Sequence, residues 1–205
     1  MTTAVVLAAG KAERMGEPKL LMPLAGKAAL TWVLSAALGA CDQAVVVVGG
    51  WRIQMETFLA GLPQKERIHA VYNPHYEQGM FTSVKAGAGA EAESSALLIF
   101  PGDVPLIHRS TAMAVLESVT GGGAWIGIPE TGGRRGHPVA LAGRLIQELL
   151  KEPDDGTLRL FLDRYSARTA LVPVQDRDML MDMDTPEEYE RCCAAADVLS
   201  KKQEV

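Results

Sequence analysis

Short runs of apolar, largely β-branched residues alternate along this chain with longer stretches of helical periodicity. Four of these runs are almost continuously apolar, at Ala4–Leu7, Ala44–Val48, Ile68–Tyr72 and Ala96–Phe100. Continuous apolar strands are typical of sheets that are covered on both faces. The alternation of strand and helix favours right-handed crossovers and a parallel sheet. The sequence therefore predicts an α/β fold with a single three-layer domain and a mostly parallel sheet.

The remaining elements follow from the helical and strand periodicities. The sequence predicts helices at Lys27–Ala40, Trp51–Leu62, Phe81–Ala92, His108–Thr120, Arg144–Lys151 and Thr157–Tyr165, and further strands at Ala124–Ile128, Val139–Leu141, Thr169–Val174 and Met179–Asp182. A last helix should begin after Thr185, an N-cap residue followed by Pro186 and two acids. Because no linker or repeat interrupts the pattern, we expect residues 1–200 to form one domain and 201–205 a polar tail.

Charge and hydropathy argue against several classes of partner. The 205 residues carry a formal net charge of −5 without a long basic run, which argues against nucleic acid. No apolar stretch approaches the roughly 18 residues of a membrane-spanning helix, and the first apolar run lacks the basic residues that open a signal peptide. Cys41, Cys192 and Cys193 form neither a disulfide framework nor a spaced metal site, so we expect a cytoplasmic protein without a membrane partner.

A glycine-containing turn follows the first predicted strand, at the edge where α/β sheets bind ligands. The turn consists of Leu7, Ala8, Ala9 and Gly10. Its small side chains allow close approach of a base or phosphate, and Gly10 tolerates a positive φ. Lys11, Arg14 and Lys19 add three cations, which suits a triphosphate. The spacing from Gly10 to Gly16 does not match a Walker A loop, and no G-x-G-x-x-G is present. Taken alone, the turn is equally consistent with a solvated basic loop.

Acidic residues follow the fourth apolar run and the last predicted strand. Asp103 lies in a Pro-Gly-Asp turn, and a carboxylate there is a suitable ligand for Mg²⁺, which uses one or two protein carboxylates. Asp182 and Asp184 are candidates for a second ligand. Asp182 is preferred because it is closer to the predicted strand end, and Asp184 is the alternative. A purely structural interpretation is also open, with Asp103 in an Asx turn and Asp184 helping to cap the last helix.

Two further segments offer groups that bind anions. Asn73 follows the third apolar run, and residues Gly79–Gly87 are expected to form a loop that leads into a helix, where Thr82 and Ser83 offer amides and hydroxyls. Ordinary helix capping is the alternative. Downstream, Arg134 and Arg135 on a glycine-rich loop suit bidentate binding of a phosphate, and His137 follows them directly.

These segments together resemble the MobA/MocA-like nucleotidyltransferases. The first turn matches that family's signature at Leu7, Ala8, Ala9, Gly10, Arg14, Met15, Gly16, Lys19 and Leu21, and departs from it at Ala12, where Gly or Ser is usual. The middle segment matches at Asn73, Pro74, Tyr76, Gly79, Met80, Ser83, Val84 and Gly87. The strings P-G-D-x-P around Asp103, R-G-H-P-V around His137 and D-M-D-T-P from Asp182 complete the resemblance.

The resemblance implies a Rossmann-like sheet of the nucleotide-diphospho-sugar transferase type and a Mg²⁺-dependent transfer of a nucleoside monophosphate from an NTP to molybdopterin, with release of pyrophosphate. It assigns catalysis to Arg14, Lys19 and Asp103; nucleotide binding to Leu7, Ala8, Ala9, Gly10, Asn73, Gly79 and Ser83; acceptor binding to Arg134, Arg135, His137 and Asp184; and the metal to Asp103 and Asp182. Ala9 and the two strings around His137 and Asp182 favour CTP.

Rival functions remain within and outside this family. GTP is the alternative nucleotide, and a sugar or polyol phosphate is the alternative acceptor. A non-catalytic chaperone that holds molybdopterin is the rival from another class, although the presence of Lys19 and Asp103 argues against it. A molybdenum hydroxylase that receives the product is the protein partner that this function implies.

Overall fold

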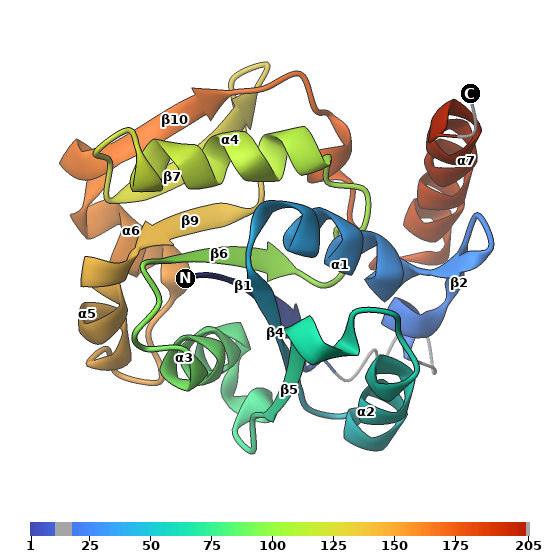
Figure 1. Ribbon diagram of the computed structural model, residues 1–205, viewed down its shortest axis with the longest axis horizontal. Coiled ribbons are helices and arrows are strands. Elements are labelled where there is room, and N and C mark those ends of the chain that lie inside the picture. The colour runs from blue at the N-terminus through green and yellow to red at the C-terminus, as the bar shows by residue number, and fades with distance from the viewer. Residues whose placement is uncertain (11–17, 204–205) are drawn as a thin grey trace.

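Seven strands in one row form the centre of the computed structural model, which describes residues 1–10 and 18–203. Their order is β10-β7-β9-β6-β1-β4-β5, from top to bottom in Figure 1. Strand β9 is antiparallel to β6 and β7, and the other neighbours in the row are parallel. The strands are β1 Thr2–Ala8, β4 Gln43–Val48, β5 Ile68–Tyr72, β6 Ala96–Pro101, β7 Ile126–Thr131, β9 Val139–Ala142 and β10 Thr169–Pro173. The predicted α/β fold with a mostly parallel sheet is confirmed.

Helices cover both faces of this sheet and make it the middle of three layers (Figure 1). One face packs against α1 (Ala29–Ala40), α2 (Arg52–Ala60) and α4 (Arg109–Thr120). The other packs against α3 (Met80–Ala90), α5 (Ile146–Leu150) and α6 (Leu158–Arg164). Because side chains alternate along a strand, β1 sends Ala4 and Val6 into the first core and Val5 into the second. Burial on both sides explains why this run is continuously apolar.

Strand β5 is less buried than its apolar sequence indicated. It ends the row of strands and pairs with β4. His69, Ala70 and Tyr72 are exposed, and the guanidinium of Arg52 lies 4.6 Å from the centre of the Tyr72 ring. The expectation of full cover on both faces is therefore wrong for this strand, because α2 and α3 only partly cover the edge.

The predicted strand at Met179–Asp182 is also wrong. Residues Asp178–Leu180 form a short 3-10 helix, and residues 181–185 have no regular structure before α7 (Pro186–Gln203) begins. The buried carboxylate of Asp176 accepts a hydrogen bond from the backbone N–H of Met179 at 3.2 Å, which holds the chain in a turn. Since β10 already forms this edge of the row, the chain leaves the sheet here.

Helix α7 stands beside a two-stranded hairpin at the right of Figure 1. The hairpin, β2 (Pro23–Leu24) and β3 (Lys27–Ala28), was not predicted. Thr185 caps α7 as predicted: its hydroxyl accepts from the N–H of Glu188, whose carboxylate accepts from the N–H of Thr185. The Tyr189 hydroxyl donates to the carbonyl of Pro23 at 2.6 Å, which ties the helix to the hairpin.

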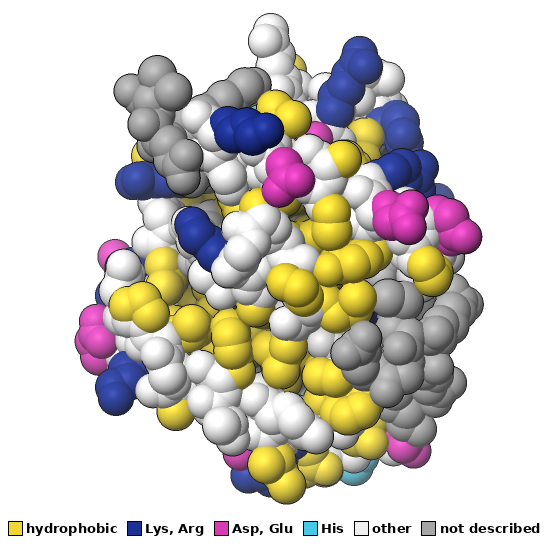
Figure 2. All heavy atoms as spheres, turned by 90° about the vertical axis from the view of Figure 1, so that its right-hand side faces the viewer, with side chains coloured by type: hydrophobic (Ala, Val, Ile, Leu, Met, Phe, Trp, Pro, Cys, Tyr) yellow, Lys and Arg dark blue, Asp and Glu magenta, His cyan; other side chains and the backbone are white. Residues whose placement is uncertain are grey.

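A third apolar cluster lies under α7 and contains Leu24, Leu106, Met183, Cys192 and Ala196. Figure 2 shows the molecule from this side, with apolar side chains gathered in the middle of the face and charged side chains towards its upper edge. In the part of the chain that the structure describes, no helix is both long and apolar enough to cross a membrane.

Candidate functional site

The chain changes its direction across the sheet beside β1. From β1 it moves outward to β4 and β5, and it then returns to β6 on the opposite side of β1. The carboxyl ends of β1 and β6 therefore mark the point of reversal beside which α/β sheets bind ligands, and we call this place the crevice. Gly10 and Asp103 follow these two strand ends, as the sequence predicted.

Two glycines allow the neighbouring backbones to close around the end of β1. A Cβ on Gly102 would lie 2.5 Å from the carbonyl oxygen of Leu7, and one on Gly49 would lie 2.4 Å from that of Ala9. Gly10 is different, because it is exposed, does not use a positive φ, and would bring a Cβ within 4 Å of nothing in the described residues. No described residue therefore blocks close approach of a ligand to Gly10.

Lys19 joins the two acidic segments across this crevice. Its ammonium nitrogen lies 3.0 Å from Oδ2 of Asp103 and 2.6 Å from Oδ1 of Asp184. Lys19 is held in a single 3-10 turn, Lys19–Leu21, whose Leu20 is buried. The turn precedes the hairpin and Asp184 precedes α7, so packing of α7 on the hairpin brings the two residues together.

The charges of this cluster shift two pKa values. Burial works against the charged form of Lys19, but Asp103 and Asp184 outweigh it, so the pKa of Lys19 is raised and its amine stays charged. Burial also raises the pKa of Asp182. The negative charges of Glu188, Asp184 and Asp103 raise this pKa further. Asp182 is thus electrostatically coupled to the cluster.

The acidic residues fit a divalent metal. Asp103 and Asp184 already share one positive charge, the Lys19 ammonium, so two hard oxygen donors converge on a cation. Mg²⁺ binds one or two such carboxylates and completes its octahedron with phosphate oxygens and water. Asp182, which the sequence favoured as second ligand, makes no contact with Lys19 among the described residues. Arg14 and Lys11 of the predicted phosphate-binding turn lie outside the described residues.

Asn73 and Ser83 are buried and bond to each other. The Asn73 amide donates to the hydroxyls of Thr82 at 2.9 Å and Ser83 at 3.0 Å, and its oxygen accepts from the N–H of His75. Helix α3 begins at Met80, directly after Gly79, whose φ of 120° few other residues adopt. The expected loop across Gly79–Gly87 and its free hydroxyls are therefore wrong. Asn73 and Ser83 fix the shape of the turn, in which Gly79 is exposed.

Arg134 and Arg135, which form the short strand β8, face different cavities. Arg134 lines a cavity of about 740 Å³, whereas Arg135 and His137 line another of about 630 Å³ with Leu158 and other apolar side chains. Alternation along a strand explains this separation. The two arginines therefore do not form the joint phosphate clamp that their adjacency suggested.

His137 lies near Asp103 and is held neutral. Its Nδ1 is buried without a hydrogen-bond partner among the described residues. Burial lowers the pKa of His137, and the charge of Asp103 opposes this shift only in part. His137 therefore places a neutral imidazole with one unsatisfied, buried nitrogen at the wall of this cavity.

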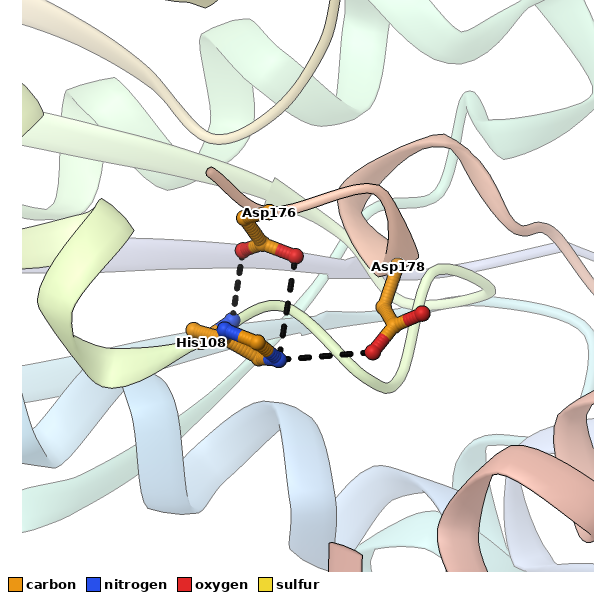
Figure 3. A group of neighbouring side chains, drawn as sticks. All are labelled: His108, Asp176 and Asp178. Atoms are coloured by element: carbon orange, nitrogen blue, oxygen red, sulfur yellow. Dashed lines mark hydrogen bonds and ion pairs between the residues drawn. The ribbon is translucent and has the colours of Figure 1, made fainter. Parts of the chain in front are cut away.

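Sequence reasoning missed a second cluster, His108, Asp176 and Asp178, in which both carboxylates point towards the histidine (Figure 3). Among the described residues, it is the one group of at least three His, Cys, Asp or Glu side chains whose potential metal-ligand atoms lie within 4.8 Å of one another. Asp176 already accepts from the His108 N–H at 2.9 Å and the Thr111 hydroxyl at 2.7 Å. The amino end of α4, which begins after His108, also disfavours a cation. We therefore interpret Asp176 as an anchor for its segment.

Comparisons with known proteins agree with this geometry. A family model described as the MobA-like NTP transferase domain matches residues 4–169. The chain is 26% identical over 188 residues to the molybdenum cofactor cytidylyltransferase of Escherichia coli, which covers 90% of this chain and 92% of that protein.

Solved structures also resemble this chain over almost its whole length. The crystal structure of the Rv0371c homologue from Mycobacterium sp. strain JC1 has a TM-score of 0.77 and 26% identity, covering 97% of this chain and 98% of that one. The structure of Rv0371c from Mycobacterium tuberculosis in complex with manganese has a TM-score of 0.69 and 21% identity, covering 95% and 98%.

Proposed function

Because this chain belongs to the MobA-like NTP transferase family and is a nucleotidyltransferase, we propose that it transfers CMP from CTP to the phosphate of molybdopterin with the help of Mg²⁺. The observation that carries the proposal is the Lys19 ammonium between Asp103 and Asp184 at the strand-order reversal. A binding protein without catalytic activity has no need of a cation and two carboxylates that meet at one point.

In the proposed reaction, a phosphate oxygen of the acceptor attacks the α-phosphorus of CTP. A new P–O bond forms, the bond between the α-phosphorus and the bridging oxygen breaks, and pyrophosphate leaves with that oxygen. A phosphate monoester is already an anion near pH 7, so the protein needs no general base. The contribution of the chain is position and charge neutralisation.

The residues of the crevice divide this work. The nucleotide would lie against the backbone at the end of β1, formed by Leu7, Ala8, Ala9 and Gly10. The absence of described atoms beside Gly10 supports this placement. Asp103 and Asp184 would hold Mg²⁺, with Asp182 nearby, and the ion when bound supplies positive charge to the reacting phosphates. The Lys19 amine would exchange its carboxylate partners for phosphate oxygens. Its raised pKa keeps it protonated for this role.

The choice of CTP and molybdopterin is supported by the Escherichia coli relative, whose name is molybdenum cofactor cytidylyltransferase. The complex of Rv0371c with manganese supports a divalent metal. His137, Arg134 and Arg135 are the acceptor-side residues in this proposal, and Arg14 joins Lys19 at the phosphates. The three cysteines are free thiols, which suits a cytoplasmic enzyme that delivers its product to a molybdenum hydroxylase.

The test is incubation with molybdopterin and Mg²⁺ plus CTP, GTP or ATP, followed by measurement of pyrophosphate. We expect release with CTP at the highest kcat/KM, and loss of release in Asp103→Asn with molybdopterin binding retained. Release of pyrophosphate with a sugar phosphate but not with molybdopterin would show that the acceptor is a sugar phosphate. Absence of release with every NTP and acceptor, together with tight binding of molybdopterin, would favour the chaperone function.

A further inference from the structure

The cavity that Arg134 lines contains two more arginines that no sequence motif singled out, Arg177 and Arg191. We call it the arginine cavity; its walls are Thr131, Gly132, Arg134, Arg177, Leu180, Met181, Asp182, Glu188 and Arg191. Its volume of about 740 Å³ lies in the range that holds a small organic ligand and far exceeds the space of a lone phosphate. The size indicates a ligand with an organic body.

The positive charge of the arginine cavity is only partly compensated. Arg191 lies 3.6 Å from a carboxylate oxygen of Glu188. Arg134 and Arg177 are exposed and form no ion pair with any other described residue. Uncompensated guanidinium groups around one hollow favour binding of an anion, and their planar donors match phosphate oxygens in pairs.

Three separate elements fix these arginines. Arg134 belongs to β8, which pairs with β7. Arg177 follows Asp176, which accepts from the backbone N–H of His108 (Figure 3) and from the hydroxyl of Thr111 and is thereby anchored to the amino end of α4. Arg191 lies in α7, whose first turn is held by the reciprocal bonds of Thr185 and Glu188. The cavity is therefore built on ordered backbone even though its arginine side chains are exposed.

The arginine cavity adjoins the crevice through Asp182. This residue lines the cavity and lies on the same short segment as Asp184, which contacts Lys19 in the crevice. A ligand anion held by the arginines thus lies beside the segment that carries Asp184. Leu180 and Met181 offer an apolar wall to the uncharged part of the same ligand.

We infer that the arginine cavity receives the phosphate of the acceptor and that Arg177 and Arg191, together with Arg134, bind it. This inference rests on the proposed transferase function and adds two specificity-determining residues to it. The substrate class that follows is an organic phosphate monoester, whose anion the arginines orient while its body packs against Leu180 and Met181.

Turnover kinetics give the first test, with Arg177→Ala and Arg191→Ala compared with wild type. We expect the KM for the acceptor to rise about tenfold or more in each, as for loss of a hydrogen bond to a charged group, with the KM for CTP within about twofold. Arg52→Ala, on α2, is the matched control. Arg177→Lys should restore only part of the loss. A rise in the KM for CTP alone, or no change in either KM, would overturn the inference.

Binding of inorganic phosphate gives a test that needs no turnover. We expect calorimetry without nucleotide or metal to show weak phosphate binding to wild type and Arg52→Ala, and no measurable binding to an Arg177→Ala/Arg191→Ala double variant. Equal binding by all three proteins would contradict the inference. Loss of phosphate binding in the double variant, combined with a wild type that never releases pyrophosphate, would refute the proposed function while retaining the anion site.

Discussion

The crevice beside β1 and the arginine cavity beside β8 differ in whether their cationic side chains are paired with carboxylates. In the crevice, one ammonium is shared between the carboxylates of Asp103 and Asp184, so its positive charge is compensated within the protein. In the arginine cavity, Arg134 and Arg177 have no described ion-pair partner. A compensated cluster must exchange partners when a ligand arrives, whereas uncompensated cations attract an anion from solution. The first arrangement suits the reacting groups and the second suits capture of an acceptor.

The largest expected effect comes from removing one carboxylate of the compensated cluster. Asp103→Asn should lower kcat for pyrophosphate release by about 10³-fold, because it removes charge from the metal-binding side of the reacting phosphates. Its melting temperature should change little, since Asp103 is partly exposed. Asp155→Asn, an exposed acid elsewhere, is the control. A kcat within about tenfold of wild type would place the metal away from Asp103.

Replacing Lys19 separates its effect on the reacting phosphates from its effect on metal binding. Lys19→Met should lower kcat about 10²-fold, because a phosphate loses its positive partner. The same change should tighten Mn²⁺ binding in the absence of nucleotide, since Lys19 competes with the metal for both carboxylates. Paramagnetic resonance of free Mn²⁺ measures this directly, with the exposed Lys151→Met as control. Weaker Mn²⁺ binding would show that Lys19 organises the carboxylates and does not compete for them.

The two acids before α7 give a sharper comparison. Because Asp184 shares a cation with Asp103, Asp184→Asn should weaken Mn²⁺ binding about tenfold, a change typical of one lost ligand or its support. Asp182→Asn should weaken it less, because Asp182 is coupled to the cluster only through its field. Titration with Mn²⁺, followed by paramagnetic resonance, compares the two variants. A larger loss in Asp182→Asn would restore Asp182 as the second ligand.

The anchor of the arginine cavity should affect stability. Asp176 is 1% exposed and accepts hydrogen bonds from His108, Thr111 and Met179. Asp176→Asn turns an amide N–H towards some of these donors and should lower the free energy of unfolding by about 1–3 kcal/mol. Asp178→Asn should cost under about 1 kcal/mol, since its contact with His108 is partly exposed. Urea denaturation compares the two, and equal losses would argue against the anchor.

Sequence reasoning succeeded where local pattern and global fold agree. The apolar runs of β1, β4 and β6 and the turns after β1 and β6 follow from burial on two faces and from the geometry of parallel strands. Thr185 was identified as a cap because capping is a local interaction. Lys19 and Asp103 were singled out by their motifs, and Asp103 follows the end of β6 as expected, while their roles stay predictions.

Other features depend on contacts between distant segments and leave little local trace. The Lys19–Asp184 pair spans 165 positions and requires α7 to pack on an unpredicted hairpin. The turn after β10 looked like a strand because Met179 and Leu180 are apolar, but their burial serves a 3-10 turn that Asp176 holds. Arg177 and Arg191 belong to no motif. Their meeting with Arg134 depends on tertiary packing alone.

The smallest expected effect concerns His137, which lines the apolar cavity beside Arg135 and is influenced by Asp103 of the crevice. Burial lowers the pKa of this imidazole, while the negative charge of Asp103 favours its protonated form. Asp103→Asn removes the opposing charge, so the pKa of His137 should fall further below its ordinary value. NMR titration of the His137 ring measures the shift, and Asp155→Asn should leave it unchanged. An unchanged or higher pKa in Asp103→Asn would mean that Lys19 screens the carboxylate from His137, and the crevice and the cavity of His137 would then be electrostatically independent.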